Sequence, residues 1–262
     1  MTYAVNRDPW IEQAKRVIFA DDAVRVSLEA KNKDLLKFGR SQQVQTTSST
    51  LMTLPAGVYN ETYVSSNLIN SIISTSAGDT QSVVVEGHTI SGSDLTFVSQ
   101  SVTLTGQTVA ALGTALARVS RVYNNGTTDL AGVISVSETN TYSAGGVPVT
   151  AALVHAQIRA GKNQTEKAAT SLSSSDYWVI TSFYADMLEK TAASADILLE
   201  VRLAGKVFRQ QASISVSENH RAIFNFKPYL IVPPNSDVRL RAIASAAGKD
   251  ISGGIEGTLL KE

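Results

Sequence analysis

Alternating runs of Val, Ile, Thr and Ser fill the chain almost without interruption from Gln42 to Leu260, and short groups of Gly, Asn and Asp separate these runs. β-branched side chains fit the pleated surface of a strand, whereas Gly, Asn and Asp accept the backbone angles of tight turns. Strand-like runs that recur roughly every 8–12 residues with turn residues between them are typical of β-sandwiches and jelly rolls. We therefore predict a mainly β fold.

The expected strands fall into two groups along the chain. A boundary near Val149–Gly161 follows the loop Tyr142–Gly146 and precedes a new series of strands. Residues 41–150 are predicted to form a first β-sandwich unit, and residues 151–262 a second, jelly-roll-like unit. In the second unit Pro233-Pro234 predicts a rigid corner, because proline cannot take a ladder position inside a sheet. A single sandwich with a long excursion is the alternative.

Residues 1–40 are predicted to form an N-terminal arm with one short helix. Asp8 can cap this helix, Pro9 tolerates its first position, and apolar side chains then recur at helical spacing. A helix this short is marginal alone and must dock on its own domain or on a neighbour. The charged stretch Asp21–Arg40 is either a solvated connector or an arm lying on an adjacent subunit. The candidate interface residues are Trp10, Ile11, Val17, Lys31, Lys33, Lys37 and Arg40.

Charge and cysteine content exclude several classes of site. The chain has 23 basic and 23 acidic residues, so no net charge draws it toward nucleic acid or an anionic membrane. Its lack of cysteine excludes disulfides, thiolate zinc sites and thiol catalysis. The first residues lack the apolar core of a signal peptide, and no apolar run approaches the ~20 residues needed to span a bilayer. We expect synthesis in a host cytoplasm and no membrane partner.

Residues that could carry chemistry are scattered. His88, His155 and His220 lie far apart in the sequence, without a second ligand at metal-binding spacing, so they are interpreted as strand or turn histidines. Asp79, Asp94 and Glu86 could surround a calcium ion, but ordinary turn caps are the favoured interpretation. There is no Gly-x-Ser-x-Gly elbow and no recognisable pair of catalytic carboxylates. We therefore expect no enzymatic activity, no cofactor and no metal requirement.

The densest aromatic cluster lies in one predicted strand. Tyr177, Trp178, Phe183 and Tyr184 fall within eight residues of one another. Alternation along a strand places Tyr177 and Trp178 on opposite faces, which favours core packing for part of the cluster. Exposed aromatic side chains are also common binding anchors. Tyr177, Trp178 and Tyr184 are therefore the candidates for an aromatic platform that binds carbohydrate or a partner.

Several short segments occur in a characteristic order. They are Lys37-Phe38-Gly39-Arg40, Ile73-Ser74-Thr75-Ser76-Ala77-Gly78-Asp79-Thr80, Val102-Thr103-Leu104-Thr105-Gly106, Gly161-Lys162-Asn163-Gln164-Thr165, and the Pro233-Pro234 corner followed by Asp237-Val238-Arg239. This order resembles that of virion structural proteins of marine tailed phages, over most of the chain from about Lys37. The chain departs from them at Ser171–Asp176, where such proteins often show a Val-Pro-Ala-Gly turn. The resemblance implies a virion component that is capsid-associated or cement-like.

These interpretations converge on a non-enzymatic capsid cement or decoration protein that stabilises the assembled head. The alternatives are a ring component of the head-to-tail neck or tail, and a carbohydrate-binding or receptor-binding tail module. The expected partners are further copies of the chain, with a trimer favoured, and the major capsid protein or other virion proteins. We expect no direct contact with nucleic acid, and we expect the protein in the virion.

Two predicted strands carry no proline that would block pairing with another chain at their edges. They are Ser82–Glu86 and Ser213–Val216. An unguarded edge strand presents unpaired backbone groups to another chain. We therefore expect both strands to lie at open sheet edges and to favour self-association.

Overall fold

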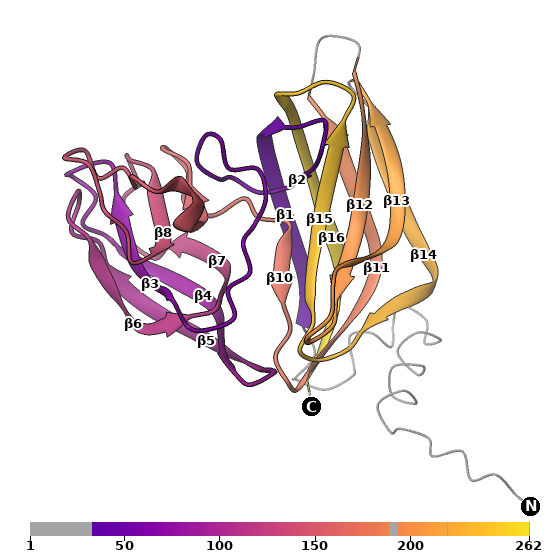
Figure 1. The fold of residues 1–262 in the computed structure, drawn as a ribbon, viewed down its shortest axis with the longest axis horizontal. Helices are drawn as coiled ribbons and strands as arrows, with labels where there is room; N and C mark the ends of the chain where they lie inside the picture. The colour runs from indigo at the N-terminus through magenta and orange to yellow at the C-terminus, as the bar shows by residue number, and fades with distance from the viewer. Residues whose placement is uncertain (1–32, 189–192, 219, 262) are drawn as a thin grey trace, which may run out of the picture.

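The computed structural model describes residues 33–188, 193–218 and 220–261, which form two β-sandwiches lying side by side (Figure 1). Among these residues there is no α-helix, and the one helical element is the 3₁₀ turn η1 (Ala151–Leu153). The prediction of a mainly β protein with two sandwich units is confirmed. The helix predicted after Asp8, and the candidate interface residues Trp10, Ile11, Val17 and Lys31, lie outside the described residues.

The larger sandwich has the strand order of a jelly roll. Its strands are β1 (Lys33–Val44), β2 (Ser49–Thr50), β10 (Ala169–Ser171), β11 (Asp176–Met187), β12 (Ser194–Arg202), β13 (Arg209–Ser217), β14 (Arg221–Val232), β15 (Asp237–Ala244) and β16 (Lys249–Lys261). One sheet has the order β1-β16-β11-β14, and the other has the order β10-β15-β12-β13 with β2 also paired to β15. Strands far apart in sequence therefore alternate within each sheet, as two interleaved Greek keys require.

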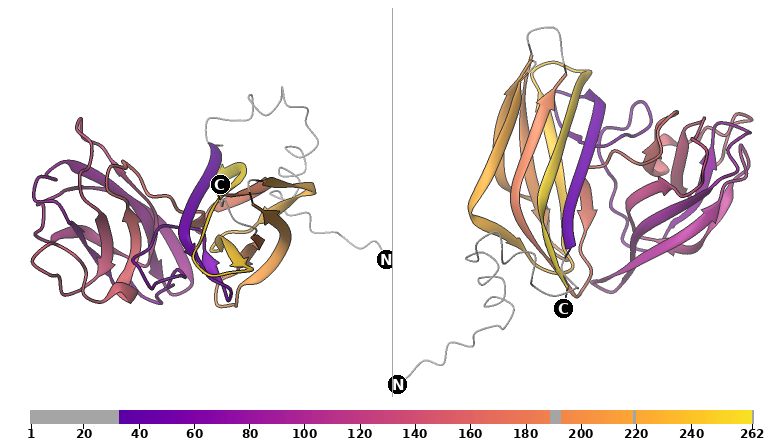
Figure 2. Two further views of the ribbon diagram at one scale, coloured as in Figure 1. Left: turned by 90° about the horizontal axis from the view of Figure 1, so that it is seen from above. Right: turned by 180° about the vertical axis from the view of Figure 1, so that it is seen from behind.

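The smaller sandwich is built from the residues between β2 and β10. Its strands are β3 (Ile69–Ser74), β4 (Ser82–Ser91), β5 (Asp94–Thr103), β6 (Ala110–Leu116), β7 (Arg118–Asn124), β8 (Ile134–Glu138) and β9 (Val154–Ile158). They form the sheets β6-β3-β8-β9 and β5-β4-β7. Both views in Figure 2 show this unit beside the jelly roll, next to the side that carries β1 and β10. The smaller sandwich is thus an insertion into the larger one.

The insertion begins and ends at one strand position of the jelly roll. Thr50 pairs with Arg241 of β15, and Ala169 pairs with Arg239, two residues earlier on the same strand. Between them, the amide of Leu51 donates to the carbonyl of Leu240, whose own amide donates to the carbonyl of Ala168. Consequently β2 and β10 run in the same direction along β15 and share one strand's place.

The sheets divide the chain differently from the expected boundaries at residues 40 and 150. β1 starts inside the predicted arm and pairs with β16 along its length, from Lys33 opposite Leu259 to Val44 opposite Lys249. β9 follows residue 150 but pairs with β8 and completes the smaller sandwich. Periodicity identifies a strand from its own side chains, whereas its partner is chosen by contacts distant in sequence. The division into consecutive units was wrong for this reason.

Gly39 shows how closely the β1 end of the jelly roll is packed. A Cβ atom at this position would collide with the carbonyl oxygen of Leu51 and with the backbone nitrogen of Ala168. Both of these atoms belong to the strand position where the insertion starts and ends. The Phe38-Gly39-Arg40 segment therefore requires glycine because β1 passes directly beside both ends of the inserted sandwich.

Candidate functional site

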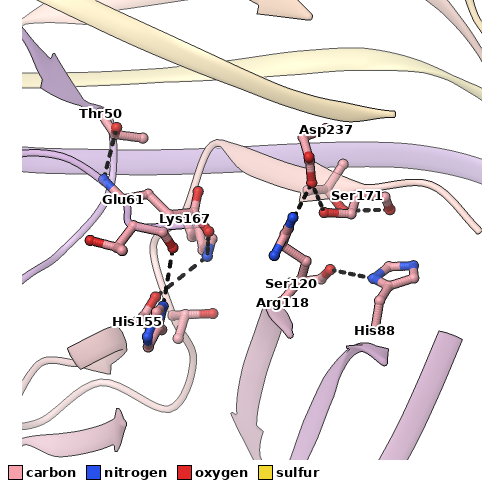
Figure 3. Close-up of polar contacts among 12 residues, drawn as sticks. Thr50, Glu61, His88, Arg118, Ser120, His155, Lys167, Ser171 and Asp237 are labelled. Carbon is pink, nitrogen blue, oxygen red and sulfur yellow. Dashed lines mark hydrogen bonds and ion pairs between the residues drawn. The ribbon is translucent and has the colours of Figure 1, made fainter. Parts of the chain in front are cut away.

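Charged side chains are buried along the seam between the two sandwiches (Figure 3). Asp237 of β15 is 4% exposed, and its Oδ1 accepts hydrogen bonds from Arg118 Nε (3.0 Å) and Ser171 Oγ (2.5 Å). Its Oδ2 accepts a hydrogen bond from Arg202 Nε at 2.9 Å. Because Arg118 belongs to β7 of the smaller sandwich, this ion pair joins the two units. Removing one partner of such a pair leaves an uncompensated buried charge, which typically costs about 3–5 kcal/mol.

Arg118 makes further contacts that hold it at the seam. Its Nη1 donates to the carbonyl of Val64 at 2.5 Å and to the carbonyl of Ala117 at 2.7 Å. The ring of Tyr63 lies close to two guanidinium groups, with centroid distances of 5.1 Å to Arg118 and 4.3 Å to Arg202. Burial is the largest influence on the pKa of the Tyr63 hydroxyl and raises it well above its ordinary value. The hydroxyl therefore stays neutral beside the carboxylates of the seam.

A second buried ion pair lies further along the seam. Lys167 Nζ donates to Glu61 Oε1, and the two side chains are 2% and 4% exposed. The same ammonium lies 3.4 Å from the carbonyl oxygen of His155, whose Nε2 is 3.1 Å from Glu138 Oε1. Burial lowers the pKa of His155, while the hydrogen bond with Glu138 partly opposes the shift. Strands β8 and β9 and the two connections between the sandwiches are thereby held by one polar network.

Lys37 belongs to the seam and not to a free arm. It is 8% exposed, and its Nζ donates to the carbonyl oxygen of Ser120 on β7 at 2.6 Å. Burial, followed by the neighbouring charges of Lys167 and Arg121, lowers the pKa of Lys37 to about 7. Carboxylates at Glu86 and Glu61 partly oppose this. The side chain expected to reach an adjacent subunit instead connects the two sandwiches of one chain.

The other described interface candidates also lie on β1. Arg40 binds Asp250 through Nε at 2.8 Å and Nη2 at 2.5 Å, so it is committed within the jelly roll. Lys33 is exposed at the start of the strand. A high density of charge indicated a solvated segment, but pairing with β16 converts it into a strand whose alternate side chains face inward.

A cleft of about 390 Å³ opens at the seam beside Lys37. We call it the seam cleft. The polar side chains that line it include Lys37, Glu86, His88, Arg121, Lys167 and Asp176. The apolar side chains include Leu36, Phe38, Phe97 and Leu259. Strands of both sandwiches contribute, so the cleft exists only when the two units are in contact.

The three histidines occupy separate surroundings. His88 of β4 is buried, with Nδ1 3.4 Å from Ser120 Oγ, and burial lowers its pKa to about 4. His155 lies in the network described above, and His220 is exposed, with Nδ1 2.7 Å from the carbonyl oxygen of Glu218. In the part of the chain that the structure describes, no group of three or more His, Cys, Asp or Glu side chains is arranged to hold a metal ion.

The three acidic residues considered for calcium do not share a site. Asp79 accepts hydrogen bonds from Ser74 Oγ (2.6 Å) and from the amides of Ala131 and Gly132 (both 2.9 Å). Burial alone would raise its pKa, but these hydrogen bonds outweigh burial and lower it. Asp94 accepts a hydrogen bond from Asn235 Nδ2 at 3.2 Å, and Glu86 lines the seam cleft. Asp79 therefore caps backbone amides, as the favoured interpretation expected, but the amides belong to Ala131 and Gly132 and not to its own turn.

The three aromatic candidates do not form one platform. Trp178 is fully buried in the core of the jelly roll and cannot meet a ligand. Tyr177 packs with Val179 and Leu260, and Arg221 covers the ring of Tyr184 at 4.4 Å from its centroid. Core packing, which alternation along β11 favoured for part of the cluster, holds for Trp178, so a platform made of all three residues is wrong.

The expectation about open edges is right for one strand and wrong for the other. Ser213–Val216 lies in β13, which ends its sheet, and β14 ends the facing sheet. Ser82–Glu86 lies in β4, which is paired with β5 on one side and β7 on the other.

Within the described residues, no helix is long and apolar enough to cross a membrane.

The sequence did not mark three of the charged seam residues as a site. Glu61, Arg118 and Lys167 are isolated charges within or beside apolar strand sequence, and that isolation is the signal that could have marked them. Asp237 was noticed only as part of the segment after Pro233-Pro234. A charge in a predicted strand interior is retained only where it is paired.

Comparisons with known proteins identify no family. No protein-family model matches the chain, and no curated protein matches it. Among solved structures, it aligns with a chain of infectious bursal disease virus Gt strain at 12% identity, covering 87% of this chain and 72% of that chain with a TM-score of 0.22. A chain of the T13 particle of the same virus aligns at 9% identity, with 88% and 69% coverage and a TM-score of 0.25. The tandem CBM22 domain of Paenibacillus barcinonensis Xyn10C aligns at 11% identity, with 88% and 94% coverage and a TM-score of 0.22. Alignments this loose carry no conclusion about function.

Proposed function

We propose that this chain is a virion structural protein, and specifically a capsid cement or decoration protein. The observation that carries the proposal is the jelly-roll strand order of the larger sandwich. Jelly rolls recur in viral capsid and lectin domains, although a fold by itself does not dictate a function. The order of short segments that resembles virion proteins of marine tailed phages adds to this, and two of those segments, Lys37–Arg40 and Pro233–Arg239, lie in the jelly roll.

Rigid coupling of the two sandwiches supports a role in reinforcing an assembly. A cement protein stabilises a particle by binding across its subunits, and each bound copy shifts the equilibrium toward the assembled state. A flexible two-unit protein would lose entropy on bridging two sites. Here the buried pair of Arg118 and Asp237, together with Lys37 bonded to Ser120, holds the units in one arrangement before binding.

Open strand edges supply surfaces on which copies can meet. β13 and β14 each pair on one side only, and the exposed side chains of Val207 and Ile223 lie before β13 and within β14. Apolar side chains next to unpaired backbone groups favour pairing with another chain. We propose that copies associate here, with a trimer as the favoured form, and that capsid subunits are the other partners.

Copy number in purified particles tests the proposal. Quantitative mass spectrometry of virions that contain this chain is expected to count hundreds of copies, since symmetric shells repeat one contact many times. About a dozen copies would replace the cement role with a ring role in the neck or tail. Absence from particles would overturn the virion assignment altogether.

A further inference from the structure

The seam cleft holds an ammonium group that is only partly satisfied. A lysine ammonium has three N–H donors. Within the described part of the chain, Lys37 Nζ makes one hydrogen bond, to the carbonyl oxygen of Ser120. The side chain is 8% exposed and lines the cleft. A buried donor without an acceptor is costly, so the remaining donors favour an acceptor brought by a ligand.

The charges around Lys37 leave the local balance positive. Two cations lie near Lys37: Arg121 of β7 and Lys167 of the segment before β10. Two carboxylates also lie near it, Glu86 of β4 and Glu61 of the β2–β3 connection. Each cation repels the Lys37 ammonium more strongly than either carboxylate attracts it. Glu61 and Lys167 form an ion pair and offset each other, which leaves Arg121 as the nearest unoffset cation. The other ionisable groups that line the cleft are His88, which burial keeps neutral, Asp176 and Lys261. An anion beside Lys37 would therefore be attracted by the surrounding charge.

The rim of the cleft is apolar. Leu36, Phe38 and Phe97 line the cleft and are 59%, 38% and 45% exposed, which is unusual for such large side chains on a β surface. Phe97 packs edge-to-face against His88, with 5.6 Å between ring centroids, so its position is fixed. Ligand sites typically combine an apolar lining with a few fixed polar groups and have volumes of about 300–1,000 Å³. At about 390 Å³, the seam cleft meets this description.

We propose that the seam cleft binds a small organic carboxylate, whose carboxylate group accepts hydrogen bonds from Lys37 and whose apolar body lies against Phe97 and Phe38. Charge complementarity selects the anion, and the aromatic rim selects an apolar body over a hydrated inorganic ion. This inference goes beyond the virion role and does not depend on it. Because both sandwiches line the cleft, a bound carboxylate would also stabilise their contact.

Calorimetric titration of the full chain with benzoate tests the proposal. Benzoate is expected to bind at one site, and benzyl alcohol, which has the same ring without the charge, is expected to bind at least tenfold more weakly. Inorganic phosphate is expected to bind more weakly than benzoate because it lacks the apolar body. Equal affinities for benzoate and benzyl alcohol, or tighter binding of phosphate, would overturn the proposed ligand class.

Substitution and pH identify the group that binds the carboxylate. Lys37→Met is expected to reduce benzoate affinity at least tenfold, whereas Lys33→Met, on the same strand but outside the cleft, is expected to leave it unchanged. Since the pKa of Lys37 is about 7, affinity for the wild-type chain is expected to fall about tenfold from pH 6 to pH 8 as the ammonium loses its proton. An affinity that is independent of pH, or equally reduced in both variants, would exclude Lys37 as the binding group.

A measurement on the unmodified chain covers the case in which Lys37→Met does not fold. Acetic anhydride labels neutral lysine amines, and peptide mass mapping reports each lysine separately. At pH 7.5 saturating benzoate is expected to reduce labelling of Lys37 several-fold while labelling of Lys33 stays constant. Unchanged labelling of Lys37 in the presence of benzoate would contradict the proposal without any variant.

Discussion

The two sandwiches are closed by different kinds of contact. The smaller one uses strands from one continuous stretch, Ile69 to Ile158, and its buried cluster consists of Ile, Val, Leu and Ala side chains. The jelly roll joins the two ends of the described chain by pairing β1 with β16, and its core contains Trp178, Phe183 and Met187. Neighbouring segments can form the first without the second, whereas the jelly roll needs contacts that span the whole insertion. Its stability should accordingly depend more on single large core side chains.

The largest effect is expected from a core substitution in the jelly roll. Phe183 is fully buried and stacks on Phe224 with 5.4 Å between ring centroids. Phe183→Ala should lower the free energy of unfolding by about 3–5 kcal/mol, whereas Ile72→Val in the smaller sandwich should cost about 0.5–1.5 kcal/mol. Scanning calorimetry measures both. A loss below about 2 kcal/mol for Phe183→Ala would contradict the weight given to this aromatic side chain.

The next effect concerns the seam. Asp237→Asn removes the charge that Arg118 and Arg202 share, and should cost about 3 kcal/mol because a buried guanidinium is left uncompensated. Calorimetry should then show two transitions, one for each sandwich, whereas one transition is expected for the wild-type chain. Asp34→Asn, at an exposed position of β1, is the matched control and should change stability by less than about 0.5 kcal/mol. A single transition in the Asp237 variant would mean that apolar contacts alone couple the units.

Sequence reasoning identified the class of fold and most strand positions, because Val, Ile and Thr runs report the pleated environment of each strand directly. It could not show that β1 pairs with β16 across the insertion, because register and partner depend on distant surfaces. Lys37 illustrates the same limit within the site: its sequence neighbours Lys33 and Arg40 indicate a solvated segment, while its burial depends on β7 of another unit. For Asp79 the sequence indicated a carboxylate that caps amides, but it could not show that those amides belong to Ala131 and Gly132, 52 and 53 residues further along the chain.

A smaller effect is expected in a turn of the smaller sandwich. Asp79→Asn should cost about 1–3 kcal/mol, because the carboxylate accepts three hydrogen bonds while buried. The folded-state pKa of Asp79 lies below its ordinary value of 3.8, so its contribution is complete above that pH and is lost as pH falls through the folded-state value. Thermal unfolding between pH 6 and pH 2.5 should show a steeper decline for the wild-type chain than for the variant. Parallel declines would assign the acid sensitivity to other carboxylates.

The smallest effect is the change in the free energy of unfolding with pH that Lys37 causes. In the folded chain the pKa of Lys37 is lowered from 10.5 to about 7, so between these values the unfolded chain binds the proton more tightly. Stability should therefore rise as pH increases through this window, by up to about 1.4 kcal/mol per pH unit. Lys37→Met should remove most of this rise, and Lys33→Met should keep it. Denaturant unfolding at pH 7.5 and 8.5 measures the slope, and identical slopes in all three proteins would place Lys37 in contact with solvent.

Because β2 and β10 share one strand position, the inserted sandwich could be replaced in the chain without changing the strand order of the jelly roll. Met52 and Lys167 form an isolated antiparallel β-bridge, and the amide of Thr53 donates to the carbonyl of Glu166 at 3.0 Å. The two connections between the sandwiches therefore already lie side by side. A short turn could replace everything between them without moving a strand of the jelly roll, and an unrelated domain with neighbouring termini could be grafted at the same place. The jelly roll thus serves as a constant frame whose strand pairing does not need the insertion, and an exchanged domain would have to supply new partners for Lys37 and Asp237.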